Sequence, residues 1–336
     1  MEKENISIGE AEALISGAMT ANGVPDAVSR SVATALVAAE TEGQVGHGFS
    51  RLADYIAQFR SGKVNQSAEP QCQVTGDTAF LIDAQNGFAF PALDMALERG
   101  IDAARKYGSA TMSVTRSHHC GALSVQVDKL ARKGLVGMMV ANAPAAIAPW
   151  GSNTPLFGTN PIAFAAPRPG RDPLVIDLSL SRVARGKVMH AKKSGQPIPE
   201  GWALDRDGKP TTDPEAALAG SMLPIGGAKG TALALMVEIL ASVMTGALFS
   251  SHASSFFAAD GPPPGVGQHL LALQPATGDA AFGDRLEALL AEIEALDGTR
   301  LPGTRRAEAI RQATANGIAV PLRYVEAARR LAGRPA

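Results

Sequence analysis

"ATMSVTRSHHCGALSVQVDKLARKG", residues 110–134, predicts a strand that turns directly into a helix. The run 110–115 is β-branched and apolar, whereas 122–133 has the pattern of a helix and is closed by a glycine. A turn between a strand and a helix presents backbone N–H groups to ligands. This turn also carries two histidines and a cysteine, so a metal site, a nucleophile, an acid–base pair and a plain polar turn are all open interpretations.

The same alternation continues on both sides of the turn. Short β-branched or apolar runs bounded by glycine, proline or asparagine predict further strands at 78–84, 136–142, 161–167, 173–179 and 270–275. Helical patterns predict three helices in the first sixty residues, and others at 91–107, 231–247, 284–296, 305–317 and 321–333. The fold class is therefore mixed α/β, with helices at both ends of the chain.

A chain of 336 residues is long enough for two domains. We expect one helical domain built from 1–70 with 284–336, and a mixed-sheet domain over 71–283. Ser7 and Glu10 form a capping-box pattern, which places the start of the first helix. Residues 250–268 predict a long loop, and loops of that length often form a lid or an interface.

The composition indicates a folded protein whose net charge does not attract it strongly to charged partners. The formal net charge is −1, which favours neither nucleic acid nor a membrane surface. Two cysteines cannot form a disulfide framework, and the N-terminus has no signal-peptide core, so we expect a cytoplasmic protein. The apolar run 231–248 contains Glu238, which favours a buried or interface helix over a membrane span.

The two histidines and the cysteine do not have the spacing of a metal site. Zinc sites need three or four ligands, adjacent histidines point in different directions, and neither C-x-x-C nor H-E-x-x-H occurs. A nucleophilic Cys120 would need a base and an oxyanion hole that cannot be located in the sequence. We therefore predict no metal, and a turn that faces a ligand.

Nucleotide-binding fingerprints are absent from the sequence. No G-x-G-x-x-G follows a strand, and "PIGGAKGTAL" (224–233) does not match a P-loop. Its glycines and Lys229 precede a helix, a pattern that suits phosphate binding but also an ordinary glycine turn before a buried helix.

"GHGFSR" (46–51) combines an imidazole and a guanidinium. His47 lies between two glycines, which let a substrate come close, and Arg51 follows four residues later. This pair suits proton transfer onto a substrate whose carboxylate the arginine binds. The alternative is a turn-capping histidine beside a surface ion pair.

Five motifs occur in one order along the chain: "GHGFSR", "SHHCGAL", "LFGTNPIAF", "VIDLSLS" and "GGAKGTALALMVEIL". Together they resemble the malate/L-lactate dehydrogenase type-2 family of NAD(P)-dependent oxidoreductases, over roughly residues 5–330. The resemblance implies NADPH or NADH as the cofactor, a small carboxylate as the substrate and a nucleotide-binding fold that is not a Rossmann fold. It also implies a homodimer.

The resemblance further implies a role for each matched residue. His47 matches the catalytic proton donor, Arg51 the residue that holds the substrate carboxylate, and Thr159 a residue that contacts the substrate. The cofactor-binding positions would be His119, Cys120, Gly121, Ala122, Leu123, Asp177, Leu178, Ser179, Lys229 and, in a looser match, Arg306.

The substrate is the open question within this family. "SHHC", with His118, is similar to the cyclic-imine reductases, whereas Gly46 and Lys187 stand where those enzymes have serine and aspartate. We predict a reductase of Δ1-pyrroline-2-carboxylate or Δ1-piperideine-2-carboxylate, acting in proline metabolism. The alternative is a 2-hydroxy-acid dehydrogenase of the malate, lactate or ureidoglycolate type, and the most distant one a non-catalytic ligand-binding protein.

Overall fold

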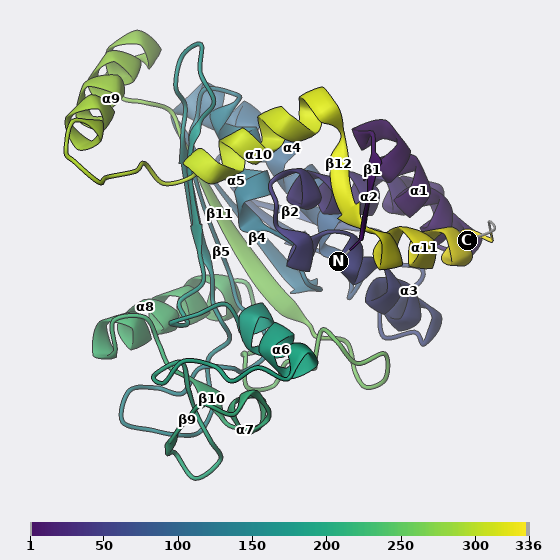
Figure 1. The fold of residues 1–336 in the computed structure, drawn as a ribbon. Helices are drawn as coiled ribbons and strands as arrows, with labels where there is room; N and C mark the ends of the chain where they lie inside the picture. Colours follow the sequence, from purple (N-terminus) through teal and green to yellow (C-terminus); the bar gives the residue numbers. More distant parts are fainter. Residues whose placement is uncertain (1, 334–336) are drawn as a thin grey trace.

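A seven-stranded mixed sheet forms the centre of the computed structural model, which describes residues 2–333 (Figure 1). Its strands lie in the order β2 (Gln71–Gly76), β3 (Ala79–Asp83), β4 (Ser109–Ser117), β11 (Val266–Leu273), β5 (Val136–Ala141), β6 (Ile162–Ala166) and β7 (Leu174–Leu178). Only β3 and β4 pair in parallel, and the other neighbours are antiparallel. The prediction of a mixed α/β fold is confirmed.

The stretch 110–134 forms β4 followed by α5 (Leu123–Ala131), as the pattern predicts. Two helices, α4 (Ala89–Tyr107) and α5, pack on the sheet and share one apolar core with it. The approach of α4 to the sheet is close, because a Cβ added at Gly100 would lie 2.0 Å from Met112 Sδ in β4. A glycine inside this helix therefore serves packing rather than flexibility.

Residues from both ends of the chain build a second layer of helices beside the sheet (Figure 1). Its elements are α1 (Ile8–Ala21), α2 (Asp26–Thr41), α3 (Leu52–Arg60), α10 (Thr304–Asn316), α11 (Leu322–Leu331) and an antiparallel pair of strands, β1 (Lys3–Ile6) with β12 (Ile318–Pro321). The predicted capping box at Ser7 and Glu10 is confirmed. The β1–β12 pair was not predicted, since its two four-residue strands lie more than 300 residues apart.

Residues 185–243 form a third packed unit at one end of the sheet. It contains α6 (Arg185–Ser194), β8 (Ala203–Leu204), β9 (Pro210–Thr211), α7 (Pro214–Ala219), β10 (Ser221–Met222), α8 (Ala228–Glu238) and the π-helical turn η3 (Ile239–Val243). The predicted helix 231–247 corresponds to α8 and η3. The predicted loop 250–268 is too long, because residues 266–268 already belong to β11.

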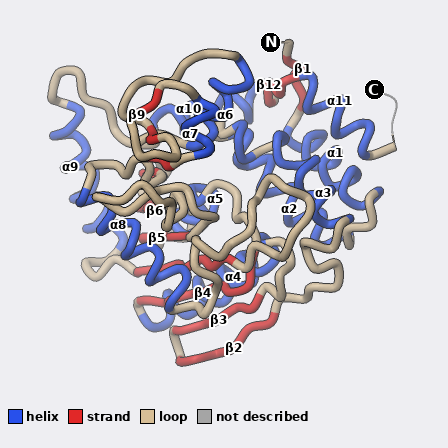
Figure 2. Tube along the Cα trace, turned by 90° about the horizontal axis from the view of Figure 1, so that it is seen from below, coloured by secondary structure: helices blue, strands red, loops and turns tan. Residues whose placement is uncertain are grey.

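The helix α9 (Asp279–Glu294) stands apart from the other C-terminal helices, on the far side of the sheet from α1 and α11 (Figures 1 and 2). Glu287 on α9 accepts a hydrogen bond from Arg168 Nε at 2.6 Å, and Gly283 faces Pro169. No residue of α9 belongs to the apolar cluster of the helical layer. Within residues 2–333, no helix is long and apolar enough to cross a membrane.

Candidate active site

His47 lies in a short 3-10 turn, η1 (Val45–His47), between α2 and α3. The next residue, Gly48, leaves room for Glu40, because an added Cβ would lie 2.0 Å from Glu40 Oε2 and that side chain would have to move. The Glu40 carboxylate accepts the Phe49 N–H at 2.9 Å, and its burial raises the pKa of Glu40 to about 7. A buried acid therefore fixes the backbone between the histidine and the arginine of the "GHGFSR" motif.

Arg51 ends the second 3-10 turn, η2 (Phe49–Arg51), directly before α3. Its side chain is buried, and Nε donates to the carbonyl of Gly46 at 2.9 Å. Nη1 lies 3.9 Å from Asp54, and the Phe257 ring covers one face of the guanidinium at 4.3 Å. A guanidinium has five N–H donors, so a carboxylate can bind Arg51 alongside Asp54.

His119 reaches His47 from the β4–α5 turn. The two rings stack with their centroids 5.4 Å apart and their planes 19° apart. Tyr55 Oη on α3 lies 2.6 Å from His119 Nδ1, and burial raises the pKa of the Tyr55 phenol, which stays protonated. The structure thus brings together two segments seventy residues apart. Gly46 and Lys187 have no hydroxyl or carboxylate that could hold the His47 ring, so the stack on His119 orients it instead.

Burial and the nearby Arg51 charge lower the pKa of His47 to about 4, although Asp177 acts in the opposite direction. His47 is therefore neutral near pH 7 in the free protein and able to accept a proton. His118 is fully buried, and its Nε2 lies 2.6 Å from Gln58 Oε1. Its ring contacts Tyr55 and Phe256, both of which also contact His119.

A second cluster joins four elements around Asp177, at the end of β7. Asp177 Oδ2 accepts the Ser124 N–H at 3.0 Å in the first turn of α5. Arg306 from α10 lies 3.0 Å from Glu42 Oε2 and 4.0 Å from Asp177 Oδ2, and Ser124 Oγ also donates to Glu42. Two carboxylates thus compensate the charge of Arg306.

Thr159, Ser179 and Lys229 belong to three chain segments that lie side by side. The Leu180 N–H donates to the Thr159 carbonyl at 2.8 Å, and the Ile225 N–H donates to the Leu180 carbonyl at 2.8 Å. Lys229 is exposed in the first turn of α8, which follows the glycine turn. No contact between described residues joins Lys229 to the histidine stack.

The remaining predicted cofactor positions differ in exposure. Leu178 is exposed, whereas Cys120, Ala122 and Leu123 are buried and face the core. Burial raises the pKa of the Cys120 thiol to about 12, so this side chain is not a nucleophile near neutral pH. Among the described residues, no group of three or more His, Cys, Asp or Glu side chains is placed to hold a metal.

Sequence reasoning missed four residues around the site: Glu40, Tyr55, Phe257 and Glu238. Tyr55 could have been found, because it lies one helical turn after Arg51. Glu238 was considered only as evidence against a membrane span, yet its Oε2 accepts Asn160 Nδ2 at 2.8 Å beside Thr159. Glu40 and Phe257 carry no local sequence signal.

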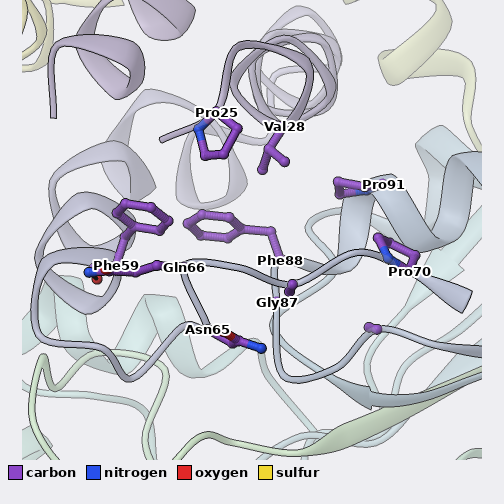
Figure 3. Close-up of a pocket in the computed structure, with 11 residues that line it drawn as sticks. Pro25, Val28, Phe59, Asn65, Gln66, Pro70, Gly87, Phe88 and Pro91 are labelled. Carbon is purple, nitrogen blue, oxygen red and sulfur yellow. Dashed lines mark hydrogen bonds between the residues drawn. The ribbon is translucent and has the colours of Figure 1, made fainter. Parts of the chain in front are cut away.

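Two cavities lie beside the helices and turns described above. The apolar cavity in Figure 3 lies beside the stacked Phe59 and Phe88 rings and measures about 20 Å³, room for about one water. A larger open groove of about 650 Å³ lies along Trp150, whose ring packs over Gly227 before α8. Only the second has the size of a ligand site.

The family model for malate/L-lactate dehydrogenase matches residues 6–327. The chain belongs to the malate/L-lactate dehydrogenase family. It is therefore an NAD(P)-dependent oxidoreductase, as the sequence predicts, and the interpretation as a non-catalytic binding protein is wrong.

Relatives in this family carry different substrate names. The chain is 51% identical over 321 residues to a (2R)-3-sulfolactate dehydrogenase (NADP(+)) of Chromohalobacter salexigens, covering 96% of each protein. It is 37% identical to a Δ1-pyrroline-2-carboxylate/Δ1-piperideine-2-carboxylate reductase of Pseudomonas putida, again over 96% of each. The crystal structure of Δ1-piperideine-2-carboxylate reductase from Pseudomonas syringae matches with a TM-score of 0.92 at 36% identity, covering 98% of this chain and 99% of that one.

The family's cofactor fits the backbone of this chain. The N-terminus of α8 has no side-chain cap, so its first-turn N–H groups suit phosphate oxygens, whereas the Ser124 N–H in the first turn of α5 already donates to Asp177. Gly226 and Gly227, both at φ +62°, let the backbone come close to a ligand before α8.

Proposed function

We propose that the protein interconverts a small 2-hydroxy acid and the corresponding 2-oxo acid with NADPH or NADH, with sulfolactate as the first candidate substrate. The observation that carries the proposal is the neutral His47 beside Arg51, a buried guanidinium whose Nε is held by the Gly46 carbonyl. The 51% identity to a sulfolactate dehydrogenase supports the choice of substrate.

In this proposal the residues of the chain bind the substrate and move one proton. Arg51 binds the carboxylate through its Nη groups, and Thr159 contacts the substrate from the segment beside Ser179. The nicotinamide supplies or accepts the hydride when it is bound. His47 takes the proton of the hydroxyl during oxidation, a role for which its lowered pKa keeps it neutral, and returns it during reduction.

The cofactor contacts in this proposal come from three places. The backbone of 119–123, the Asp177–Ser179 segment and the first turn of α8 with Lys229 would hold it. Arg306 acts there by fixing Glu42 and Asp177, to which it is paired. The single parallel pair in the sheet supports a nucleotide-binding fold other than the parallel Rossmann fold.

Reduction of a cyclic imine carboxylate is the second candidate. His118 favours it, because the imine reductases share "SHH", and relatives with that activity cover almost the whole chain. Gly46 and Lys187 weigh against it, since no serine or aspartate stands beside His47.

One experiment separates the candidates. The purified protein is incubated with NADPH and with NADH, each with 3-sulfopyruvate, oxaloacetate, pyruvate, Δ1-pyrroline-2-carboxylate or Δ1-piperideine-2-carboxylate, and cofactor oxidation is followed by absorbance. We expect the highest kcat/KM with a 2-oxo acid. Higher kcat/KM with an imine would replace the first candidate by the second, and no turnover with the whole panel would contradict both.

We also propose a homodimer that buries the outer face of α8 and η3. This face exposes large apolar side chains: Leu235 (49%), Met236, Ile239 (45%), Val243 (58%) and Met244 (55%). Contiguous apolar patches of this kind mark interaction surfaces. A second copy of the chain is the occupant that a symmetric enzyme of this family would use.

A further inference from the structure

Residues 255–260, here called the 255–260 segment, lie in the long loop that precedes β11. Lys63, just after α3, directs its ammonium group at three carbonyls of this segment, those of Ser255, Ala258 and Asp260, at 2.7, 3.0 and 3.1 Å. The lysine is only 2% exposed. An ammonium has three N–H donors, and burying it is tolerated only when they are satisfied, as they are here.

Two other side chains of the same region each hold one more carbonyl. Gln58 Nε2 donates to the carbonyl of Phe256 at 2.8 Å, and Ser61 Oγ lies 2.5 Å from that of Ala259. Five of the six carbonyls in the segment are therefore held by α3 and the turn after it, and Phe257 alone has none of these contacts. Loops of this kind are ordinarily mobile and solvated, so this anchoring fixes the position of Phe257.

The fixed segment lies against the groups proposed to carry the reaction. The Phe256 ring packs on His119 with centroids 5.1 Å apart, and it is buried. The Phe257 ring covers Arg51 at 4.3 Å but remains 45% exposed. Because Arg51 directly precedes α3 and Lys63 lies just after its end, one helix sets both the guanidinium and the ring that covers it.

We propose that the 255–260 segment is a fixed wall of the substrate pocket, in which Phe257 is a specificity-determining residue that holds the Arg51 guanidinium in the plane that binds a small 2-oxo or 2-hydroxy carboxylate. The ring blocks one face, so the carboxylate meets the N–H groups at the edge of the guanidinium, where two parallel hydrogen bonds form. Lys63 is a positioning residue that acts through the segment. The inference rests on the role of Arg51 in the proposed function.

The test compares Phe257→Leu, Phe257→Tyr, Lys63→Met and the double variant K63M/F257L with the full-length protein. Phe257→Leu should raise KM for the preferred 2-oxo acid about 3- to 30-fold, the range of a cation–π contact, with kcat changed less than about 3-fold and KM for the cofactor unchanged. Phe257→Tyr keeps a ring and should restore KM. Tyr107→Leu removes an exposed cation–π pair with Lys106, far from the site, and serves as the matched control.

Coupling distinguishes positioning from general stability. If Lys63 acts through Phe257, Lys63→Met raises the same KM, and the double variant is no worse than the more affected single one. A KM for Phe257→Leu that stays within about 2-fold of the wild type, or additive effects in the double variant, would overturn the proposal. Phe257→Leu still decides the matter if Lys63→Met does not fold.

The same inference is measured apart from turnover. Oxalate, an unreactive analogue of a 2-oxo carboxylate, is titrated into the NADPH-saturated wild type and Phe257→Leu by calorimetry. Oxalate binding that is weakened about 3- to 30-fold in the variant supports the wall. This holds even if no substrate of the panel is turned over, because the lack of turnover contradicts only the proposed function. Equal binding in both proteins, or none in the wild type, contradicts the wall.

Discussion

His47 illustrates how much of this site depends on single residues. It forms no hydrogen bond through its ring to the described residues, and its orientation comes from the stack on His119 and from Gly48, which lets the Glu40 carboxylate approach the turn. Its charge state follows from burial and from Arg51. The residue beside it in the sequence, Gly46, contributes only a carbonyl, which Arg51 uses.

Replacing His47 by glutamine should lower kcat by about 10²-fold, because general acid–base catalysis contributes about that much. Substrate binding through Arg51 should persist, so the affinity for oxalate should change little. Steady-state kinetics and calorimetry check both statements. Near-normal turnover would remove His47 from the proposed mechanism.

The lowered pKa of His47 also affects stability. Between about pH 6.5 and pH 4 the unfolded chain binds a proton at this residue and the folded protein does not, so stability falls as the pH falls through this window. At pH 5 the loss from this group alone is roughly 2 kcal/mol, from about 1.4 kcal/mol per pKa unit. Urea unfolding at pH 7 and pH 5 should therefore show a smaller loss in His47→Gln than in the wild type. An equal loss in both proteins would contradict the assignment.

At the scale of elements, α3 does the most to place the site. Arg51 precedes it, Tyr55 holds His119, Gln58 meets both His118 and the Phe256 carbonyl, and Lys63 follows it. The "SHH" motif therefore acts through α3 as well as through the turn in which it lies. The sheet supplies the other site residues, because His119 follows β4 and Asp177 lies at the end of β7.

Tyr55→Phe tests this role of α3. It removes the hydrogen bond to His119 while keeping the ring packed against Phe88 and Phe90. We expect kcat to fall about 10-fold, with the unfolding free energy changed by only about 1 kcal/mol. Kinetics and urea unfolding measure the two quantities. A large loss of stability with unchanged kcat would show a purely structural tyrosine.

Gly100→Ala tests the contact of α4 with the sheet. The new Cβ would overlap Met112 Sδ, so we expect destabilisation by about 1–3 kcal/mol. Gly9→Ala in α1 is the matched control, because no atom lies within 4 Å of its added Cβ, and it should stabilise by up to about 1 kcal/mol. Equal effects of the two substitutions in urea unfolding would contradict the close approach.

At the scale of the whole molecule, three apolar clusters meet at the site. The helical layer supplies His47 and Arg51, the sheet supplies His119 and Asp177, and the 185–243 unit adjoins Thr159. The two domains expected from the sequence stay a prediction, and α9 lies beside Arg168 rather than among the other terminal helices.

Ile239→Glu should split the proposed homodimer, because it places a charge on the exposed apolar face of η3. Light scattering after size-exclusion chromatography should show a dimer for the wild type and a monomer for the variant. Leu289→Glu, at an exposed apolar position on α9, is the control and should leave the mass unchanged. A monomeric wild type would contradict the dimer.

The sequence by itself determined the α/β class, the six predicted strands, the first capping box and the family, because these depend on local periodicity and on short motifs. It also predicted His47, Arg51 and His119 as site residues, through their motifs and not through any expected contact. Only the tertiary structure stacked His47 on His119, paired Arg306 with Glu42 and Asp177, and laid Phe257 on Arg51. These contacts join residues between about 70 and 260 positions apart, and no local pattern encodes them, because packing of the helical layer on the sheet alone brings them together.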